Sequence, residues 1–369
     1  MRILVDGRSL LPIVPGLGPT GVGRWTRNVL RALATGAPSW DIRVTIVTKD
    51  PVETDVATFG PNVSLHVVRF PERWFRRALL LGVAPRIERT VGRADAMLGP
   101  GFVTWPGSHA QIPVIHDLAF LNHPGSVQRR NLAFLRLLMP RVVRRAAGIV
   151  TVSGAMRDEI VDRFTFDKQK VFVVPNASEA VPALSTSSVK PGYLLFVGTF
   201  EPRKNLSGVL DAYRRLRSER KDVPDLVVVG GLGWRGAEEL RREADGTPGV
   251  LTLGYVDDAR LTALYRDARM LVFPSLYEGF GLPVVEAMGA GTPVVTSRRG
   301  GLPEVAGDAA VYVDPLDPSD IARGIARLLD DPGEAARLGE AGLRQASQFT
   351  WERSGQMLKD AIETITAKS

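Results

Sequence analysis

Short runs of β-branched and other apolar residues recur along the whole chain, separated by stretches with the periodicity of amphipathic helices. Most runs are continuously apolar rather than alternating, as is typical of strands covered by helices on both faces of a parallel sheet. This alternation predicts an α/β fold made of doubly wound, Rossmann-like domains. The predicted strands cover residues 2–6, 43–48, 64–68, 96–98, 113–116, 148–152 and 171–174 in the first half, and 193–197, 226–229, 250–253, 270–273, 293–296 and 310–313 in the second.

The chain has 369 residues, more than one ordinary domain holds, so two domains of typical size are expected. The join is predicted at NASEAVPALSTSSVK, which begins at Asn176, is rich in Ser, Ala and Pro, and lacks a helical or strand period. After Phe349 a helical period returns, with Thr350 as a good N-cap, and we expect this last helix to pack back on the first domain. The predicted boundaries are residues 1–176 for an N-terminal domain, 177–190 for a linker, 191–349 for a C-terminal domain and 350–369 for the last helix.

Cysteine is absent from the sequence. A disulfide framework, a thiolate metal site and a cysteine nucleophile are therefore excluded, and a reducing cytoplasm fits this composition. No stretch reaches the roughly 18 consecutive apolar residues that a membrane-spanning helix needs. The opening MRILVDGRSL is better explained as a buried strand than as a secretory signal. We expect a cytoplasmic protein that at most lies on the cytoplasmic face of a membrane.

The net charge of +7 is shared unevenly between the two halves. Residues 1–180 carry 24 Lys and Arg against 14 Asp and Glu, whereas residues 181–369 carry 23 against 26. A basic first half predicts an anionic partner there: nucleic acid, an anionic lipid surface or a phosphate-bearing substrate. The stretch 69–89, which mixes Arg with Trp and Phe, is interpreted as an amphipathic helix on lipid, with a core helix that has an Arg-rich solvent face as the alternative. The stretch 128–145 is interpreted as a core helix with an Arg-rich solvent face.

The segment VGTFEPRKN follows the predicted strand that ends at Val197. Gly198 permits close approach of a ligand to the backbone, and Asn205 is a candidate N-cap of the next helix. Arg203 and Lys204 therefore lie beside the positive end of a helix, an arrangement suited to a diphosphate. Taken alone, an Arg-Lys pair before a helix is more often two solvated surface charges.

A second motif, YEGFGLPVVEAMGAGTPVV, follows the predicted strand 270–273. Glu278 lies in its loop, and Glu286 lies one turn into the following helix. The backbone N–H groups of Phe280, Gly281 and Leu282 precede or begin that helix and are available to phosphate or sugar oxygens. Carboxylates accept hydrogen bonds from vicinal hydroxyl groups, so the two glutamates predict a ribose and a hexose as ligands.

Three weaker signals lie at other predicted strand ends. Val256 ends a strand in LGYVDD, where backbone groups can face a nucleobase, although an ordinary strand–helix connection explains it equally well. Gly21 and Gly23 in GLGPTGVGR open a helix and could receive a phosphate. His116 in VIHDL ends an apolar strand, and Asp117 could orient its imidazole or cap the turn. Such a histidine, taken alone, is more often structural.

The GTFEPRKN segment and the Glu278–Glu286 pair together closely resemble retaining glycosyltransferases of the GT-B fold, family 4 (glycosyl transferases group 1, mannosyltransferase-like). The resemblance extends to MRILVDGRSL, TGVGR, VIHDL, TVS at 151–153 and FTWERS. It implies two Rossmann-like domains whose parallel sheets face a cleft. It further implies that Glu278 contacts the donor sugar, that Glu286 holds the ribose of the nucleotide, and that Arg203 and Lys204 carry the diphosphate.

The same resemblance implies a histidine beside the transferring sugar at His116, a glycine loop that touches donor phosphate and acceptor, and retention of anomeric configuration. Arg203, Lys204 and helix amides would stabilise the leaving diphosphate. No cofactor or metal is expected, which agrees with the absence of any Asp-x-Asp tripeptide. No obvious covalent nucleophile is present, so we expect same-face displacement in which Glu278 and His116 position and stabilise.

The substrates stay open at this point. Nothing in residues 227–265 decides between uracil and guanine, so the donor is expected to be GDP-mannose or a UDP-sugar. The acceptor is a hydroxyl of a glycan, a glycolipid or a small molecule. Competing interpretations are a sugar-nucleotide epimerase of the same fold and a non-catalytic sugar-nucleotide-binding protein. Nucleic-acid binding is disfavoured, because no aromatic-interleaved or zinc-bearing module accompanies the basic half.

Overall fold

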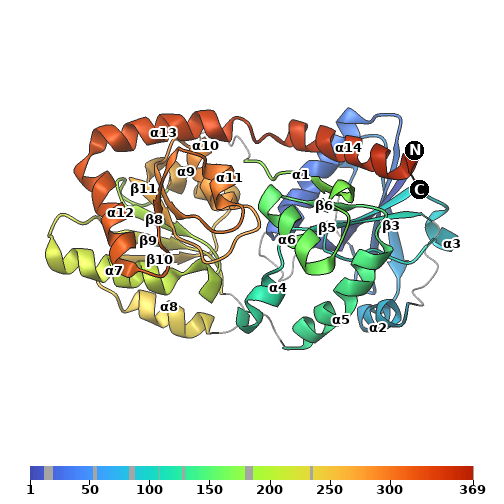
Figure 1. Cartoon of the computed structure of the whole chain (residues 1–369), viewed down its shortest axis with the longest axis horizontal. Helices are drawn as coiled ribbons and strands as arrows, with labels where there is room; N and C mark the ends of the chain where they lie inside the picture. The colour runs from blue at the N-terminus through green and yellow to red at the C-terminus, as the bar shows by residue number, and fades with distance from the viewer. Residues whose placement is uncertain are drawn as a thin grey trace. The chain divides into compact units, whose positions relative to one another are not determined.

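A computed structural model describes residues 1–11, 20–52, 56–82, 88–107, 109–126, 129–178, 186–232 and 236–368. The chain forms two compact units, each coloured by residue number in Figure 1. The first unit comprises Met1–Leu118, Arg130–Asn176 and Trp351–Ser369, and the second comprises Ala119–Arg129 and Ala177–Thr350.

In the described part of the first unit, seven parallel strands form one sheet in the order β3-β2-β1-β4-β5-β6-β7. The chain therefore reverses its direction of winding between β1 and β4. The strands are β1 Arg2–Asp6, β2 Asp41–Thr48, β3 Val63–Arg69, β4 Ala96–Gly99, β5 Ala110–Ile115, β6 Ile149–Thr151 and β7 Val171–Val173. Helical elements are η1 Gly7–Leu10, α1 Gly21–Gly36, η2 Ala57–Phe59, α2 Glu72–Leu81, α3 Glu88–Val91, α5 Arg129–Arg145, α6 Gly154–Phe164, η4 Lys168–Lys170 and α14 Trp351–Ala367.

The C-terminal helix α14 packs on α1 in the first unit. Gly355 of α14 faces Ala32 of α1 so closely that a Cβ added at Gly355 would lie 2.5 Å from the Ala32 Cβ. Leu358 and Ile362 of α14 are buried in the same apolar cluster as the inward face of α1. A helix from the end of the sequence thus completes the core of the first unit, because its apolar stripe needs a covering partner.

Over the part of the second unit that is described, six parallel strands are ordered β10-β9-β8-β11-β12-β13. The strands are β8 Leu194–Val197, β9 Leu226–Val229, β10 Val250–Gly254, β11 Met270–Phe273, β12 Val294–Ser297 and β13 Ala310–Val313. Helical elements are α4 Ala119–Asn122, η3 Pro124–Ser126, η5 Pro202–Lys204, α7 Leu206–Glu219, α8 Ala237–Asp245, α9 Asp258–Asp267, α10 Leu282–Gly289, α11 Leu302–Ala306, α12 Pro318–Asp330 and α13 Pro332–Ala346.

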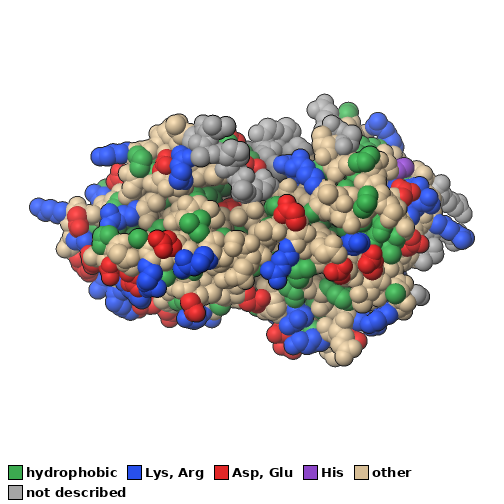
Figure 2. Space-filling model, turned by 90° about the horizontal axis from the view of Figure 1, so that it is seen from above, with side chains coloured by type: hydrophobic (Ala, Val, Ile, Leu, Met, Phe, Trp, Pro, Cys, Tyr) green, Lys and Arg blue, Asp and Glu red, His purple; other side chains and the backbone are tan. Residues whose placement is uncertain are grey.

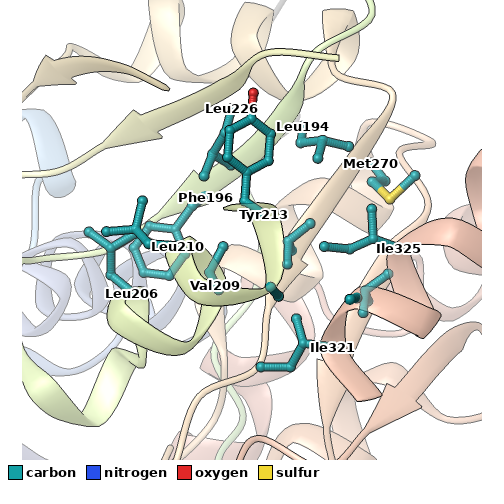
Figure 3. Packing of buried hydrophobic residues seen from close by; sticks show 14 of the residues in the cluster. Leu194, Phe196, Leu206, Val209, Leu210, Tyr213, Leu226, Met270, Ile321 and Ile325 are labelled. Atoms are coloured by element: carbon teal, nitrogen blue, oxygen red, sulfur yellow. The ribbon is translucent and has the colours of Figure 1, made fainter. Parts of the chain in front are cut away.

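One face of this second sheet is covered by α7, α8 and α12 (Figure 3). Leu210 and Tyr213 of α7 and Ile325 of α12 pack against Phe196 and other strand residues in one buried cluster. Alternate residues along each strand point to the opposite face. Because residues on both faces of β8, β9 and β11 are buried, these strands are continuously apolar, which is the signal that predicted them.

The switch in winding direction between β8 and β11 determines where a ligand can bind. Helices that follow neighbouring strands on the two sides of a switch point lie on opposite faces of the sheet, which leaves a crevice at the carboxyl ends of the strands. The loops after β8 and β11 carry the two predicted sugar-nucleotide motifs. Because β8 and β11 are neighbours in the sheet, both motifs lie at the same edge, where the carboxyl ends of the strands are.

All thirteen predicted strands overlap observed strands, with shifts of up to a few residues. The segment 119–129, predicted inside the N-terminal domain, belongs instead to the second unit. The ring of His123 in that segment lies 5.6 Å from the ring of Tyr277, between centroids. Of the predicted linker 177–190, residues 179–185 lie outside the described residues. In the ranges that are described, no helix is both long and apolar enough to cross a membrane.

Candidate active site

Arg203 and Lys204 lie in η5, a single 3-10 turn between β8 and α7. Pro202 occupies the first turn of this element, and Asn205 ends it in the left-handed conformation with φ 62°. The predicted N-cap role of Asn205 is wrong, because no capping hydrogen bond from its side chain is made. Its Nδ2 atom instead donates to the carbonyl oxygens of Pro274 (3.1 Å) and Pro315 (2.7 Å), tying the loop to the ends of β11 and β13.

The loop after β11 lies directly against η5. The backbone N–H of Leu276 donates to the carbonyl oxygen of Arg203 at 2.8 Å. The buried Ser275 hydroxyl lies 2.8 Å from the same carbonyl oxygen and 2.9 Å from Oε1 of Glu278. These contacts fix the two loops together and aim the Glu278 carboxylate at the basic pair.

Two cations and two carboxylates form a compact ionic network at this edge of the sheet. The Lys204 Nζ atom lies 2.5 Å from Oε1 of Glu278, and Nη1 of Arg203 lies 3.4 Å from Oε2 of Glu278. Nε of Arg203 donates to Oε2 of Glu201 at 2.8 Å. Lys204 is only 9% exposed and Glu278 only 6%. The basic pair is therefore not a pair of solvated surface charges.

Burial and neighbouring charges set the ionisation of this network. Burial lowers the pKa of Lys204, and the Arg203 charge lowers it further, whereas Glu278 and Glu201 act in the opposite direction. Burial alone would raise the pKa of Glu278, but the charges of Lys204 and Arg203 outweigh it and hold that pKa below its usual value. The two carboxylates offset the two cations, so the network carries no excess charge although its groups are largely removed from water.

The α10 helix begins next to Glu278 with Gly281 as its N-cap residue, at φ 114°. The positive φ favours glycine at position 281, and a Cβ there would lie 2.6 Å from the end of the Leu302 side chain, which would have to shift. The backbone N–H groups of Gly281 and Leu282 stand at the start of the helix, where no preceding helical carbonyl can accept from them. Phe280 precedes them, with its ring 5.5 Å from that of Phe349.

Glu286, the fifth residue of α10, is held by a tyrosine that the sequence did not single out. The Tyr265 hydroxyl, from α9, donates to Oε2 of Glu286 at 2.9 Å. Tyr265 is itself buried, and its carbonyl oxygen accepts a hydrogen bond from Thr292 at 2.6 Å. The Glu286 carboxylate is thus anchored at one oxygen by a buried group. Only the adjacency of α9 and α10 reveals this, because Tyr265 has no motif of its own.

Gly300 and Gly301 pack against the backbone of the loop that carries Glu278. The N–H of Gly301 donates to the carbonyl oxygen of Glu278 at 2.9 Å. A Cβ at Gly300, where φ is +54°, would lie 1.9 Å from that same oxygen. These glycines follow β12 and were not identified from the sequence. A Gly-Gly pair close after an apolar strand was the only available signal.

Gly198, Gly230 and Gly254 bring three strand ends together beside the basic pair. Gly198 donates to the carbonyl oxygen of Val229, and Gly230 donates to that of Gly254, both at 2.9 Å. A Cβ at Gly230 would lie 1.9 Å from the Gly198 carbonyl oxygen. Val256 follows at the end of β10, where its side chain is buried. The candidate donor-binding residues of the second half thus lie at the carboxyl edge of one sheet.

His116 and the glycine segment belong to the first unit. His116 directly follows β5, and its Nε2 atom lies 3.0 Å from the carbonyl oxygen of Pro100. Its ring meets Trp25 edge-on, with centroids 5.2 Å apart. Burial lowers the pKa of His116 to about 4, despite opposing effects of the Pro100 carbonyl and Asp117. The imidazole is therefore neutral near pH 7, with Nε2–H donating to Pro100, the neighbour that orients it.

Gly21 is the first residue of α1 and Gly23 the third, with Thr20 as N-cap. The N–H of Gly23 donates to Oγ1 of Thr20 at 3.2 Å, so this amide is already satisfied. Residues 16–19 of the predicted glycine loop lie outside the described residues.

Within the basic stretches 69–89 and 128–145, residues 72–81 form α2 and residues 129–145 form α5, while residues 83–87 and 128 lie outside the described residues. Trp74 and Leu81 of α2 are 48% and 76% exposed, and the Arg77 guanidinium lies 4.9 Å from the Trp74 ring. In α5, Leu138 is buried and Leu137 is exposed. On the face drawn in Figure 2, Lys and Arg side chains are interspersed with Asp and Glu, so the excess of positive charge does not form a single patch there.

Comparisons with known proteins identify the family of this chain. The family description "Glycosyl transferases group 1" matches residues 177–345, and "Glycosyl transferase 4-like domain" matches residues 20–177. The chain is 34% identical over 267 residues to the O-antigen chain mannosyltransferase B of Escherichia coli, covering 69% of this chain and 70% of that protein. It is 37% identical over 230 residues to the MMP alpha-(1->4)-mannosyltransferase of Mycolicibacterium hassiacum, covering 61% and 55% respectively.

Among solved structures, sucrose-phosphate synthase from Thermosynechococcus elongatus superposes with a TM-score of 0.77 at 21% identity, covering 100% of this chain and 99% of that one. This superposition shows that the two proteins share a fold. The chain therefore belongs to the glycosyl transferases group 1, family 4, has the GT-B fold, and is a glycosyltransferase similar to mannosyltransferases.

Proposed function

We propose that this enzyme transfers a hexose from a nucleoside-diphosphate sugar to a hydroxyl of a glycan, glycolipid or small-molecule acceptor, with retention of configuration and without a metal. The second unit would hold the donor, and the first would receive the acceptor. The observation that supports this most strongly is the pair of half-buried Arg203 and buried Lys204, which faces Glu278 at the switch point of the second sheet.

The donor would bind by exchanging counter-ions. Glu278 lies against Lys204, and a diphosphate would replace it as the counter-ion. The N–H groups at the start of α10 would add hydrogen bonds to the phosphate, and Glu286, fixed by Tyr265, would accept from the ribose hydroxyls. Glu278, released from Lys204, would accept hydrogen bonds from the hexose. Gly198 and Val256 would border the nucleotide.

The proposed chemistry breaks the bond from the anomeric carbon to the phosphate oxygen and forms a bond from that carbon to the acceptor oxygen on the same face. The acceptor proton passes to the leaving phosphate. Arg203 and Lys204 stabilise the negative charge that develops on the diphosphate, and the burial of Lys204 strengthens this effect. His116 would act as a neutral hydrogen-bonding group beside the sugar rather than as a cation, since burial keeps its pKa near 4.

Metal independence is proposed because the two fixed cations can supply the charge stabilisation that a divalent ion supplies elsewhere. Transfer assays in excess EDTA and in added Mg²⁺ test this directly. Equal rates in both are expected, and a loss of at least tenfold in EDTA that Mg²⁺ restores would contradict it.

GDP-mannose is proposed as the first donor to test, because two relatives carry mannosyltransferase names. Titration calorimetry with GDP and UDP measures which nucleotide binds, with Lys204→Met as a control that preserves side-chain volume. We expect one nucleotide to bind wild type and to bind the variant at least tenfold more weakly. Product analysis then separates transfer, which releases nucleotide only with acceptor, from epimerisation. Failure of both nucleotides to bind wild type would refute the proposal.

We also propose that α2 contacts anionic lipid on the cytoplasmic face of a membrane. Exposed Trp74 and Leu81 beside Arg77 give an apolar surface next to positive charge. Co-sedimentation with phosphatidylcholine vesicles, with and without phosphatidylglycerol, tests this. Binding should need the anionic lipid and fall in Trp74→Ser, whereas Leu251→Ser, an exposed leucine of the second unit, should bind like wild type. Equal binding by all three proteins would refute it.

A further inference from the structure

Glu201 is a buried carboxylate of the ionic network that the proposed donor contacts do not use. It is 8% exposed, and its side chain is bound at both oxygens. Oε2 accepts from Nε of Arg203 at 2.8 Å, and Oε1 accepts from the Thr199 hydroxyl at 2.8 Å. Its backbone is also fixed, because its N–H donates to the carbonyl oxygen of Thr199 and its own carbonyl oxygen accepts from Lys204.

A carboxylate at position 201 accepts from both side-chain partners and also supplies a negative charge beside Arg203. A glutamine could keep both hydrogen bonds, because its oxygen can accept from Arg203 Nε and its NH₂ group can donate to the Thr199 hydroxyl, which also accepts. It would remove only the charge. Glutamine at this position therefore tests the charge of Glu201 separately from its hydrogen-bonding pattern.

The two carboxylates of the network are held differently. Glu278 contacts Lys204 and the Nη1 atom of Arg203, the groups proposed to meet the diphosphate. Glu201 is bound instead to Nε of Arg203 and to Thr199. A diphosphate can therefore replace Glu278 without displacing Glu201. Glu278 is an exchangeable counter-ion, and Glu201 is a permanent one.

We propose that Glu201 is a positioning residue, which holds the Arg203 guanidinium through Nε so that its Nη groups face the donor diphosphate, and which keeps a negative charge beside Lys204 when the donor displaces Glu278. This inference rests on the proposed role of Arg203 and Lys204 in holding the diphosphate. It adds a residue that touches no substrate but sets the geometry and charge of two that do.

The charge of Glu201 has a measurable consequence at Lys204. The charged groups facing Lys204 are Arg203, Glu278 and Glu201, and the Phe273 ring lies 5.3 Å from its Nζ atom. Burial and Arg203 lower the pKa of Lys204, and Glu201 is one of the two carboxylates that raise it. Removing the Glu201 charge should lower the pKa of Lys204 further. Lys204 would then lose its proton at a lower pH, so the alkaline limb of the activity profile should move to lower pH.

The test compares Glu201→Gln with wild type in donor-dependent transfer over pH 6–10. We expect kcat to fall on the order of tenfold to hundredfold, less than for outright loss of a charge-stabilising donor, and the alkaline limb of the pH profile to move to lower pH. The alkaline limb should disappear in Lys204→Arg, whose guanidinium does not titrate in this range. A folded Glu201→Gln with unchanged kcat and an unchanged alkaline limb would overturn the proposal.

Two further variants separate charge, reach and folding. Glu201→Asp keeps the charge but shortens the side chain, so kcat should fall while the alkaline limb stays at its wild-type pH. It also keeps the test decisive if Glu201→Gln does not fold, because an unchanged kcat in Glu201→Asp contradicts the positioning role. Thr199→Val removes only the Thr199 hydrogen bond and should leave the alkaline limb unchanged. Nucleotide binding to wild type must be confirmed first, since its absence refutes the proposed function rather than the role of Glu201.

Discussion

Replacing Lys204 with Met tests whether the ion pair with Glu278 is desolvated. The substitution keeps an apolar stem of similar volume but removes the ammonium that lies 2.5 Å from Oε1 of Glu278. Removing one partner of a buried pair costs about 3–5 kcal/mol, because the other charge is left without compensation. Arg203 and Ser275 still face the carboxylate, so we expect a loss of unfolding free energy near the lower end, about 3 kcal/mol.

A second substitution, Glu278→Gln, gives a more stringent test, because its effect on the unfolding free energy should have opposite signs in two backgrounds. Glu278→Gln in wild type leaves Lys204 buried opposite a neutral amide and should destabilise the protein. In the Lys204→Met background the same change removes the stranded charge, so it should restore about 1–2 kcal/mol. One mutation therefore destabilises one background and stabilises the other, which independent surface sites would not do.

Differential scanning calorimetry without nucleotide measures this cycle. For a unit of this size, about 3 kcal/mol corresponds to a fall in Tm of roughly 6–12 °C. The double variant should unfold at a higher temperature than Lys204→Met, although both should lack transferase activity. If Glu278→Gln lowers the Tm of Lys204→Met further, the pair is solvated and the electrostatic reasoning fails.

Three other outcomes follow from single contacts. Because the pKa of His116 is about 4 when folded and about 6.5 in an unfolded chain, the unfolded chain binds more protons between these pH values. The unfolding free energy measured in urea should therefore fall by up to about 3 kcal/mol from pH 6.5 to 4, and His116→Gln should lose this dependence. Tyr265→Phe should raise the donor KM roughly tenfold by freeing Glu286, with little change in kcat in steady-state assays; an unchanged KM contradicts this. Gly300→Ala should lower stability by at least about 2 kcal/mol by calorimetry, against about 1 kcal/mol for Gly254→Ala, which shares a positive φ but has open space around it; equal losses would contradict the steric argument.

The strands were predictable because burial on both faces leaves a local signature, a continuous apolar run. The same holds for the α14 helix, whose apolar stripe is visible in the sequence around Leu358 and Ile362. Its packing partner was not determined by this stripe alone, since many helices offer a matching face. The close approach of Gly355 to Ala32 of α1 became visible only in the fold.

Local rules failed where tertiary contacts competed with them. Asn205 precedes a helix and has the right side chain for a cap, yet its amide bonds to carbonyl oxygens at the ends of two other strands. His116 has Asp117 next to it in sequence, but the atom within hydrogen-bonding distance of its Nε2 belongs to Pro100, because β4 and β5 are neighbours in the sheet.

The sequence by itself determined that the chain is an α/β protein with two motifs suited to a sugar nucleotide, since residue type and spacing carry that information. It did not determine which charges meet. Lys204 and Glu278 are 74 residues apart and become partners because β8 and β11 are adjacent at the switch point. Tyr265 and Gly300 gain their roles in the same way: their importance lies in contacts with Glu286 and Glu278 from other segments of the chain, which only tertiary packing supplies.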